Sequence, residues 1–369
     1  MVEKSKPFRV LCLDGGGMRG LYTVALLDTL IKRIKGSEIK VDAGKAFDLI
    51  VGTSTGGILA VGLAYGLTIQ TIINIYTAKG AGIFSNPMPK NKIAWPLWLF
   101  RRKEAAHCGQ EALRKALEDQ FGNATIKDLY DNRNIGVCIP AVRMATRKAW
   151  VFKTPHIPAR ETHHAKNRDD NYKLIDVCMA TAAAPIVLPL VAIDSPDDEN
   201  RYDVFADGGL WANNPTLIGL IEALEITESK RDIQIVSIST ASPPSGKVIQ
   251  KNEVNFDLWP SNKSWLAGMG VLETSLDAQA SGTQFMVKFL RPHLKANVEI
   301  IRLAYDAPSN EQALCVALDR ADDKAITALT DMAKSDAENN ILGVDSRHSS
   351  SEVKLLREII SSMPIVNGE

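Results

Sequence analysis

The sequence lacks the features that mark a disulfide-rich, zinc-binding or nucleic-acid-binding protein. Its five cysteines form no C-x-x-C pair and no cluster with histidine, so we expect neither a disulfide framework nor a zinc site. The 43 Lys and Arg residues balance 43 Asp and Glu residues, so no net positive charge attracts a nucleic-acid polymer. The apolar run Val10–Leu13 is too short for a signal peptide, which predicts a cytoplasmic location.

A membrane-spanning helix is also missing, although one stretch comes close. No charged residue occurs between Asp48 and Lys79, and about 20 apolar residues suffice to cross a bilayer. The sequence GTSTGG interrupts this stretch at residues 52–57 and disfavours a straight helix. The stretch therefore predicts a buried strand, a sharp turn and a central helix.

Apolar, β-branched runs predict strands, and helical spacing recurs between several of them. The strands are expected at Phe8–Leu13, Phe47–Val51, Ile135–Val142, Ala149–Lys153, Tyr202–Ala206, Ile233–Thr240 and Val298–Leu303. Helical patterns occupy Leu21–Ile34, Gly56–Leu67 and Gln110–Phe121. Strands that alternate with helices predict a three-layer α/β/α fold, with a mostly parallel central sheet covered on both faces.

The composition changes after Leu303, where Ala, Asp, Lys and Asn dominate. Helices are expected at Asp319–Lys334 and Ser351–Ser361. We therefore divide the chain into a main domain, residues 7–305, and a helical C-terminal extension, residues 306–369, that packs on it.

A glycine-rich loop lies between the first predicted strand and the first predicted helix. The sequence Asp14-Gly15-Gly16-Gly17-Met18-Arg19-Gly20 allows a tight turn and presents backbone N–H groups at the positive end of the helix dipole. Gly15, Gly17 and Gly20 fit the pattern G-x-G-x-x-G, which makes a dinucleotide pyrophosphate one candidate for the bound anion. The same N–H groups suit the oxyanion of an acyl-transfer reaction. A purely structural glycine turn is a third interpretation.

The second predicted strand weakens the dinucleotide interpretation. A dinucleotide-binding fold places an acidic residue at the end of this strand, about 20 residues past the glycines. Val51 and Gly52 end the strand without a carboxylate, and Gly52-Thr53-Ser54-Thr55-Gly56 follows as a G-x-S-x-G pattern. Between a strand and a helix, this pattern predicts a nucleophile elbow, in which a strained turn lifts the Ser54 hydroxyl out of the sheet.

A serine needs a base within hydrogen-bond distance before it can act as a nucleophile. Asp207 ends a predicted strand and begins Asp207-Gly208-Gly209, at an edge where open α/β sheets place their sites. Burial would raise its pKa toward the range of a useful base. His293 preserves the chain order of a Ser-Asp-His triad, but its context predicts a surface or helix-terminal position. A metal shared by Asp14 and Asp207 would lack the further carboxylates of a calcium loop.

The three motifs, in this order and at these separations, resemble those of the patatin-like phospholipases. Ala180-Thr181-Ala182-Ala183-Ala184-Pro185 and Asn213-Asn214-Pro215 resemble further blocks of that family, and the resemblance extends over residues 7–305. Ser239-Thr240-Ala241 departs from the glycine-rich turn of many relatives, so a different loop shape is expected there.

The resemblance implies a lipid acyl hydrolase that needs no metal and no organic cofactor. Ser54 would be the nucleophile and Asp207 its base, while the amides of Gly15, Gly16 and Gly17 would form the oxyanion hole. Arg19 would support the glycine loop or contact a lipid phosphate, and a surface helix arginine is its structural alternative. The alternative function is a nucleotide-binding module that uses the Gly15–Gly20 loop for phosphate.

The resemblance also implies a substrate and a form of control. The substrate would be phospholipid at a membrane surface, reached by transient association with the inner face of the membrane. The segment Trp95–Lys103 combines tryptophans with three cations and suits a lipid-docking flap. Packing of the tryptophans into the core or into an oligomer interface is an equal alternative. Some bacterial members of this length resemble anti-phage effectors, which predicts a cyclic-nucleotide activator. The sequence leaves the formation of a homo-oligomer open.

Overall fold

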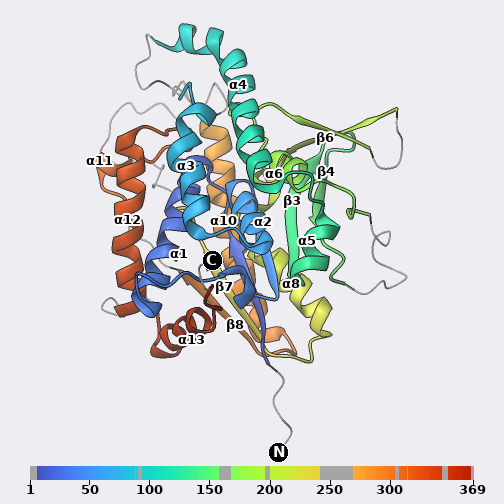
Figure 1. Cartoon of the computed structure of the whole chain (residues 1–369), viewed down its shortest axis with the longest axis vertical. Helices are drawn as coiled ribbons and strands as arrows, with labels where there is room; N and C mark the ends of the chain where they lie inside the picture. The colour runs from blue at the N-terminus through green and yellow to red at the C-terminus, as the bar shows by residue number, and fades with distance from the viewer. Residues whose placement is uncertain are drawn as a thin grey trace, which may run out of the picture.

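The computed structural model contains one eight-stranded sheet with helices on both faces (Figure 1). It describes residues 6–87, 89, 94–157, 168–195, 200–241, 269–303, 307–313, 315–342 and 348–366. The strand order is β5-β6-β3-β2-β1-β7-β8, and β4 pairs with β3 outside this path. The strands are β1 (Phe8–Leu13), β2 (Leu49–Gly52), β3 (Gly136–Arg143), β4 (Lys148–Lys153), β5 (Val191–Asp194), β6 (Tyr202–Asp207), β7 (Ile233–Ile238) and β8 (Val298–Leu303).

Parallel pairing dominates the centre of the sheet. The pairs β1–β2, β1–β7, β2–β3 and β7–β8 are parallel, whereas β3–β4, β3–β6 and β5–β6 are antiparallel. The predicted α/β fold with a mostly parallel central sheet is therefore confirmed. The strand β5 was not predicted, because its four residues follow a run that Pro185 and Pro189 interrupt.

The helices cover the sheet and extend its ends. They are α1 (Gly20–Lys35), α2 (Thr55–Tyr65), α3 (Ile69–Ile83), α4 (Trp95–Phe121), α5 (Ile126–Arg133), α6 (Leu174–Thr181), α7 (Gly209–Ala212), α8 (Thr216–Thr227), α10 (Met269–Leu290), α11 (Asn310–Ala313), α12 (Asp323–Leu342) and α13 (Ser350–Ser361). The helix α4 begins 15 residues before the predicted helix at Gln110 and forms the top of the view in Figure 1.

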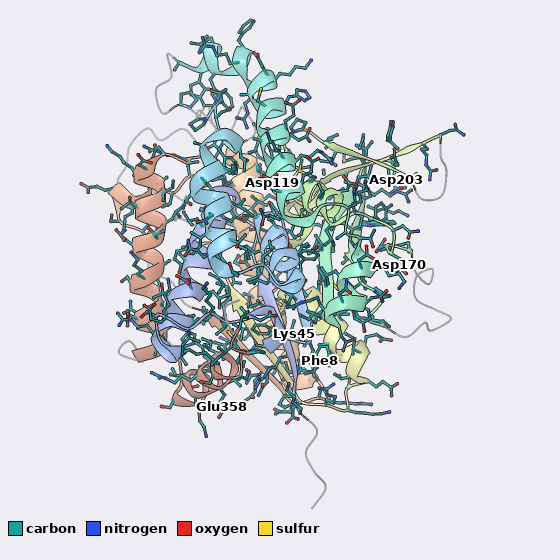
Figure 2. The ribbon with its side chains drawn as sticks, viewed as in Figure 1. Phe8, Lys45, Asp119, Asp170, Asp203 and Glu358 are labelled. Carbon is teal, nitrogen blue, oxygen red and sulfur yellow. The ribbon has the colours of Figure 1, made fainter. Side chains whose placement is uncertain are left out.

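Alternate residues of β1 face two different hydrophobic cores. Leu11 and Leu13 belong to the core that α1 and α2 cover, whereas Val10 and Cys12 belong to the core that α8 covers. Because both faces of the strand are buried, its sequence is a continuous apolar run rather than an alternation of apolar and polar residues. In Figure 2, Phe8 begins this strand at the lower edge of the sheet.

The C-terminal helices pack on the main body. Both α12 and α13 contact α1, and Leu329 and Ile359 share the core of Leu26. The helix α13 begins with a capping box formed by Ser349 and Glu352. The division of the chain into two domains between residues 305 and 306 stays a prediction. Within the described ranges, no helix combines the length and the apolar composition that a bilayer-spanning segment requires.

Candidate active site

Ser54 lies at a sharp turn between β2 and α2. Its backbone φ of 55° and ψ of −125° fall in a region that a residue with a Cβ rarely adopts. The flanking glycines permit this turn, since a Cβ at Gly52 would lie 2.0 Å from the Gly56 carbonyl oxygen. A Cβ at Gly56 would in turn lie 2.3 Å from the Leu13 carbonyl oxygen. The G-x-S-x-G pattern therefore forms the strained elbow that the sequence predicts.

The hydroxyl of Ser54 contacts the carboxylate of Asp207. Ser54 Oγ donates a hydrogen bond of 2.7 Å to Asp207 Oδ2, and the Gly209 N–H donates one of 2.6 Å to Oδ1. Burial raises the pKa of Asp207 to about 7, and the hydrogen bonds from Ser54 and Gly209 oppose this rise. No positively charged group of the described residues contacts Asp207, and a carboxylate with a pKa near neutrality is suited to act as a general base.

The strand β6 brings Asp207 to Ser54 from outside the parallel part of the sheet. It runs antiparallel to β3, and Asp207 pairs with Ala141 near the carboxyl end of that strand. The strand β3 lies beside β2, which leads to Ser54. The carboxyl ends of β2 and β6 therefore meet although the two strands run in opposite directions.

The segment 181–183 holds the backbone of both residues. Thr181 Oγ1 accepts a hydrogen bond of 2.9 Å from the Ser54 N–H and donates one of 2.6 Å to the Pro140 carbonyl oxygen. The Ala183 carbonyl oxygen accepts a hydrogen bond of 3.0 Å from the Asp207 N–H. The sequence marks this block by resemblance alone, and nothing around Thr181 indicates its contact with Ser54.

The glycine loop is held at both ends. The Gly15 N–H donates 2.9 Å to the Asn213 carbonyl oxygen, and the Met18 N–H donates 2.8 Å to the Leu318 carbonyl oxygen. Within the part of the chain that the structure describes, the amides of Gly16 and Gly17 have no acceptor, and both residues line the pocket that contains Ser54. The prediction that the Gly15 amide is an oxyanion donor is therefore corrected, because its N–H already binds the Asn213 carbonyl oxygen.

Residues distant in sequence enclose this loop. Gly17 has a φ of +57°, and a Cβ there would lie 2.3 Å from the Leu318 carbonyl oxygen, so both conformation and space require glycine. On the other side, Thr240 Oγ1 donates 3.1 Å to the Gly15 carbonyl oxygen. Thr240, which belongs to the segment where a different loop shape is expected, thus contacts the glycine loop directly. No local pattern in the sequence indicates the contact of Leu318.

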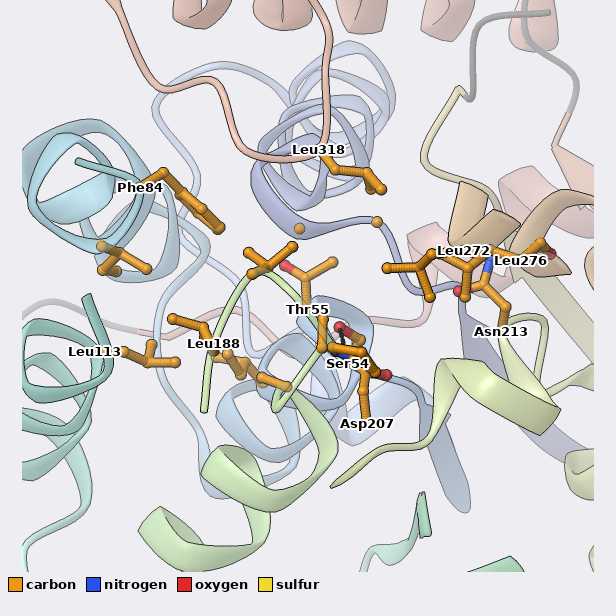
Figure 3. Close-up of a pocket in the computed structure, with 18 of the residues that line it drawn as sticks. Ser54, Thr55, Phe84, Leu113, Leu188, Asp207, Asn213, Leu272, Leu276 and Leu318 are labelled. Atoms are coloured by element: carbon orange, nitrogen blue, oxygen red, sulfur yellow. Dashed lines mark hydrogen bonds between the residues drawn. The ribbon is translucent and has the colours of Figure 1, made fainter. Parts of the chain in front are cut away.

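Ser54 and Asp207 line an apolar pocket. The pocket holds about 840 Å³ of empty space, part of it open to solvent. In Figure 3 the labelled side chains surround Ser54: Phe84, Leu113 and Leu188 lie on one side, Leu272 and Leu276 on the other, and Leu318 above it. A wall of this kind binds alkyl chains by removing their surface from water.

The geometry does not support a Ser-Asp-His triad. Among the histidines that the structure describes, none contacts Ser54 or Asp207. His293 is exposed in a turn after α10, in agreement with its predicted position. His156, in contrast, has a buried side chain that is 4% exposed.

His156 belongs to a second cluster of polar side chains, with Cys138 and Glu222. The ammonium of Lys153 donates to both carboxylate oxygens of Glu222, at 3.1 and 2.7 Å. His156 Nε2 lies 3.3 Å from the same carboxylate. Because the lysine already balances the charge of Glu222, we assign no metal to this cluster.

Arg19 supports the glycine loop from within the protein. Its N–H donates 3.1 Å to the Gly16 carbonyl oxygen, and the residue is 5% exposed. Burial raises the pKa of Glu273 in α10, and the charge of Arg19 opposes that rise, which places the guanidinium near α10. The buried position favours loop support over the surface alternative.

The tryptophans of Trp95–Lys103 are buried. Trp95 and Trp98 are 9% and 5% exposed, and their rings lie 5.5 Å apart. Trp98 Nε1 donates 3.1 Å to the Asn86 carbonyl oxygen. The guanidinium of Arg102 donates to the carbonyl oxygens of Asn86, Ile186 and Val187. The interpretation in which the tryptophans pack into the protein is therefore confirmed.

Comparison with known proteins agrees with the motifs. A sequence model described as patatin-like phospholipase matches residues 11–220. A cGAMP-activated phospholipase of Escherichia coli is 33% identical over 347 residues, which cover 88% of this chain and 87% of that protein. Proteins of the same name from Pseudomonas aeruginosa and Vibrio cholerae are 36% and 38% identical over 63% of this chain. The chain covers 62% and 64% of the lengths of these two proteins.

Proposed function

Because the chain belongs to the patatin-like phospholipase family, we propose that it hydrolyses the fatty-acyl esters of membrane glycerophospholipids through Ser54 and Asp207. The observation that supports this most strongly is the hydrogen bond of 2.7 Å between Ser54 Oγ and Asp207 Oδ2. It lies in an apolar pocket beside two amides that have no acceptor in the described part of the protein.

The first half of the reaction transfers the acyl group to the protein. Ser54 Oγ attacks the ester carbonyl carbon while its proton passes to Asp207 Oδ2. The carbonyl electron pair moves onto oxygen, and the N–H groups of Gly16 and Gly17 stabilise the oxyanion. When the bond to the glycerol oxygen breaks, Asp207 returns the proton to this oxygen, which leaves a lysophospholipid and an acyl-serine.

The second half releases the fatty acid. A water molecule attacks the acyl-serine carbonyl carbon while Asp207 accepts its proton. The same two amides stabilise the second oxyanion. Collapse of this intermediate breaks the bond to Ser54 Oγ, which takes the proton back from Asp207, and the free fatty acid leaves the pocket.

No observation favours the alternative of a nucleotide-binding module. A pyrophosphate cradle uses several N–H groups of the glycine loop, but those of Gly15 and Met18 already bind the carbonyl oxygens of Asn213 and Leu318. The strand β2 leads to Ser54 and offers no carboxylate for a ribose.

We further propose that a cyclic nucleotide activates the hydrolase, because the three relatives are named cGAMP-activated phospholipases. The implied role in anti-phage defence depends on this activation. Purified protein, incubated with phosphatidylethanolamine and phosphatidylglycerol vesicles, should release fatty acid at least about tenfold faster with cGAMP than without it, as measured by mass spectrometry of the products. Equal rates with and without cGAMP and other cyclic dinucleotides would reject the activation and leave the hydrolase proposal intact. Absence of fatty-acid release under every condition would count against the hydrolase itself.

The first turns of α4 are the surface that we propose for contact with the membrane. With Trp95 and Trp98 buried, Leu97 and Phe100 stand out at 54% and 86% exposed. Arg101 and Lys103 are exposed beside them and suit anionic headgroups. Arg102, in the turn that follows, donates to the carbonyl oxygen of Val187, and Val187 lines the pocket, so this surface lies on the side of the active site.

Replacing Leu97 and Phe100 together by serine tests this surface. Insertion of two apolar side chains contributes on the order of 2 kcal/mol or more, so vesicle hydrolysis should fall about tenfold or more. Hydrolysis of a soluble short-chain ester should change less than about twofold. The matched control replaces Phe285 and Phe289 of α10 together by serine. These two side chains are 63% and 57% exposed and lie in the last turns of α10, shortly before β8 in the chain. If the control loses vesicle hydrolysis and the α4 variant keeps it, the membrane contact lies elsewhere.

A further inference from the structure

A buried ion pair lies directly before the glycine loop. The guanidinium of Arg302 donates to both carboxylate oxygens of Asp14, with 2.8 Å between Nη1 and Oδ1. Nη1 also lies 2.7 Å from Ser237 Oγ, to which it donates. Arg302 belongs to β8 and pairs with Ser237 of β7, while Ser237 pairs with Cys12 of β1. The arginine therefore reaches across one strand to the residue that follows β1.

This pair fixes the direction in which the chain leaves the sheet. The Asp14 N–H donates 3.1 Å to the Ile238 carbonyl oxygen, so backbone and side chain are both held. The next amide, that of Gly15, is bound to Asn213, and the two after it are the proposed oxyanion donors. A bidentate guanidinium–carboxylate contact restricts both position and orientation. A shift of Asp14 would therefore move Gly16 and Gly17 relative to Ser54.

Stability alone is a weak explanation for such a pair. The side chains of Arg302 and Asp14 are 19% and 4% exposed. Removing two charges from water is costly, and a buried pair of this kind is often no more stabilising than apolar residues of similar size. A positional requirement explains why the charges occur at the start of the glycine loop.

We propose that Arg302 is a positioning residue for the oxyanion hole and acts through Asp14. It lies beyond residues 11–220, which the family model matches, and it is not among the residues that line the pocket. The inference rests on the proposed hydrolase function. Its consequence is that the last strand of the sheet, far from the three motifs in sequence, sets the catalytic rate.

A second arginine provides a matched control. Arg133 donates to both carboxylate oxygens of Asp42, at 2.7 and 2.6 Å, and also to the Ala64 carbonyl oxygen. Its side chain is 19% exposed, the same fraction as that of Arg302. Lys45, which donates to the Arg133 carbonyl oxygen, lies in Figure 2 near Phe8 at the edge where the strands begin. Arg133 binds both oxygens through Nη2 alone, whereas Arg302 uses two nitrogens, but this ion pair is likewise partly buried and lies away from the active site.

The experiment compares Arg302→Met, Arg302→Lys and Arg133→Met with the wild type on a soluble p-nitrophenyl ester in the presence of cGAMP. A misplacement of about 1 Å at a catalytic group costs about 100-fold in rate, so Arg302→Met should lower kcat between about 10- and 100-fold. KM should change less than about threefold. Arg302→Lys should recover part of kcat, and Arg133→Met should keep kcat within about twofold of the wild type.

A double variant separates positioning from stability. Asp14→Asn with Arg302→Met leaves no lone buried charge, so its unfolding midpoint should exceed that of Arg302→Met, while kcat stays low. If Arg302→Met, folded by circular dichroism, keeps kcat within about twofold of Arg133→Met, the positioning role is wrong. If the double variant recovers kcat together with stability, the pair is merely structural. A wild type that is inactive with cGAMP and with other cyclic dinucleotides would instead count against the hydrolase proposal.

Discussion

Replacing Ser54 by alanine lowers phospholipid hydrolysis between about 10³- and 10⁶-fold, the range expected when a nucleophilic serine is removed. Among the described residues, Ser54 is the one whose hydroxyl contacts the Asp207 carboxylate, at 2.7 Å, so no other described hydroxyl can replace it without movement. The measurement is fatty-acid release from vesicles with cGAMP present, with the folded state checked by thermal unfolding.

Ser195→Ala is the matched control for this substitution. Ser195 Oγ donates 3.4 Å to Asp203 Oδ2, a second serine–aspartate contact that lies outside the pocket. Both residues are buried. The control should therefore retain hydrolysis within about twofold. Equal activity of Ser54→Ala and the wild type would eliminate Ser54 as the nucleophile.

Replacing Asp207 by asparagine should abolish hydrolysis and stabilise the protein at the same time. Asparagine can still bind Ser54 and the Gly209 N–H, but it cannot take the serine proton, so the rate should fall at least about 1,000-fold. In the wild type, kcat/KM should rise with pH through about 7, because burial raises the pKa of Asp207 to about 7 and the base acts in its ionised form.

The stability effect follows from the same pKa. Between the ordinary value of 3.8 and about 7, the folded protein binds a proton that the unfolded chain releases. Wild-type stability therefore falls as pH rises through this window, by on the order of 4 kcal/mol. Because asparagine does not titrate, Asp207→Asn should match the wild type near pH 4 and exceed its stability above pH 7.

The control for this prediction lies on the same strand. Asp203 is buried like Asp207 but binds the guanidinium of Arg143 at 2.7 Å. Asp203→Asn removes one member of an ion pair and should destabilise the protein at pH 8. Chemical denaturation at pH 4 and pH 8 measures all three proteins. A lower stability of Asp207→Asn at pH 8 would contradict the proposed ionisation of a buried, unpaired carboxylate.

The central strands could be predicted because their residues are buried on both faces. In β1 the predicted and observed bounds agree at Phe8–Leu13, because the apolar run ends at Asp14 and the glycines that follow favour a turn. The strand β5 has four residues, two of which are exposed, and so carries no comparable pattern. Trp95 and Trp98 could not be placed from sequence, because an aromatic side chain suits the core and a membrane interface equally well.

The residues that we propose to react could be found in the sequence for a different reason. Ser54 and the glycine loop each require a backbone that side chains would obstruct, so glycines mark them in the sequence. Asp207 is marked by the glycines that follow it. In contrast, Leu318 acts through its backbone carbonyl, which every residue possesses.

Long-range contacts explain why the other residues of the site could not be predicted from the sequence. Thr181, Asn213 and Arg302 act on residues that lie more than 100 positions away in the chain. Their side chains belong to ordinary helix, loop and strand segments. Only the order of strands in the folded sheet, with β6 antiparallel to β3 and β8 two places from β1, brings them to the site. The contact between the Gly15 N–H and the Asn213 carbonyl oxygen could not be predicted for the same reason, because Asn213 is remote in sequence.

The most direct test is the pH dependence of Ser54 modification by a fluorophosphonate, followed by mass spectrometry with cGAMP present. A serine activated by Asp207 should be the modified residue, at a rate that rises through about pH 7 and then levels off, as expected for a carboxylate with a pKa of about 7. Asp207→Asn should react at least about 100-fold more slowly, and its modification rate should not rise through pH 7. Modification of another residue, or the same profile in Asp207→Asn as in the wild type, would contradict the Ser54–Asp207 mechanism.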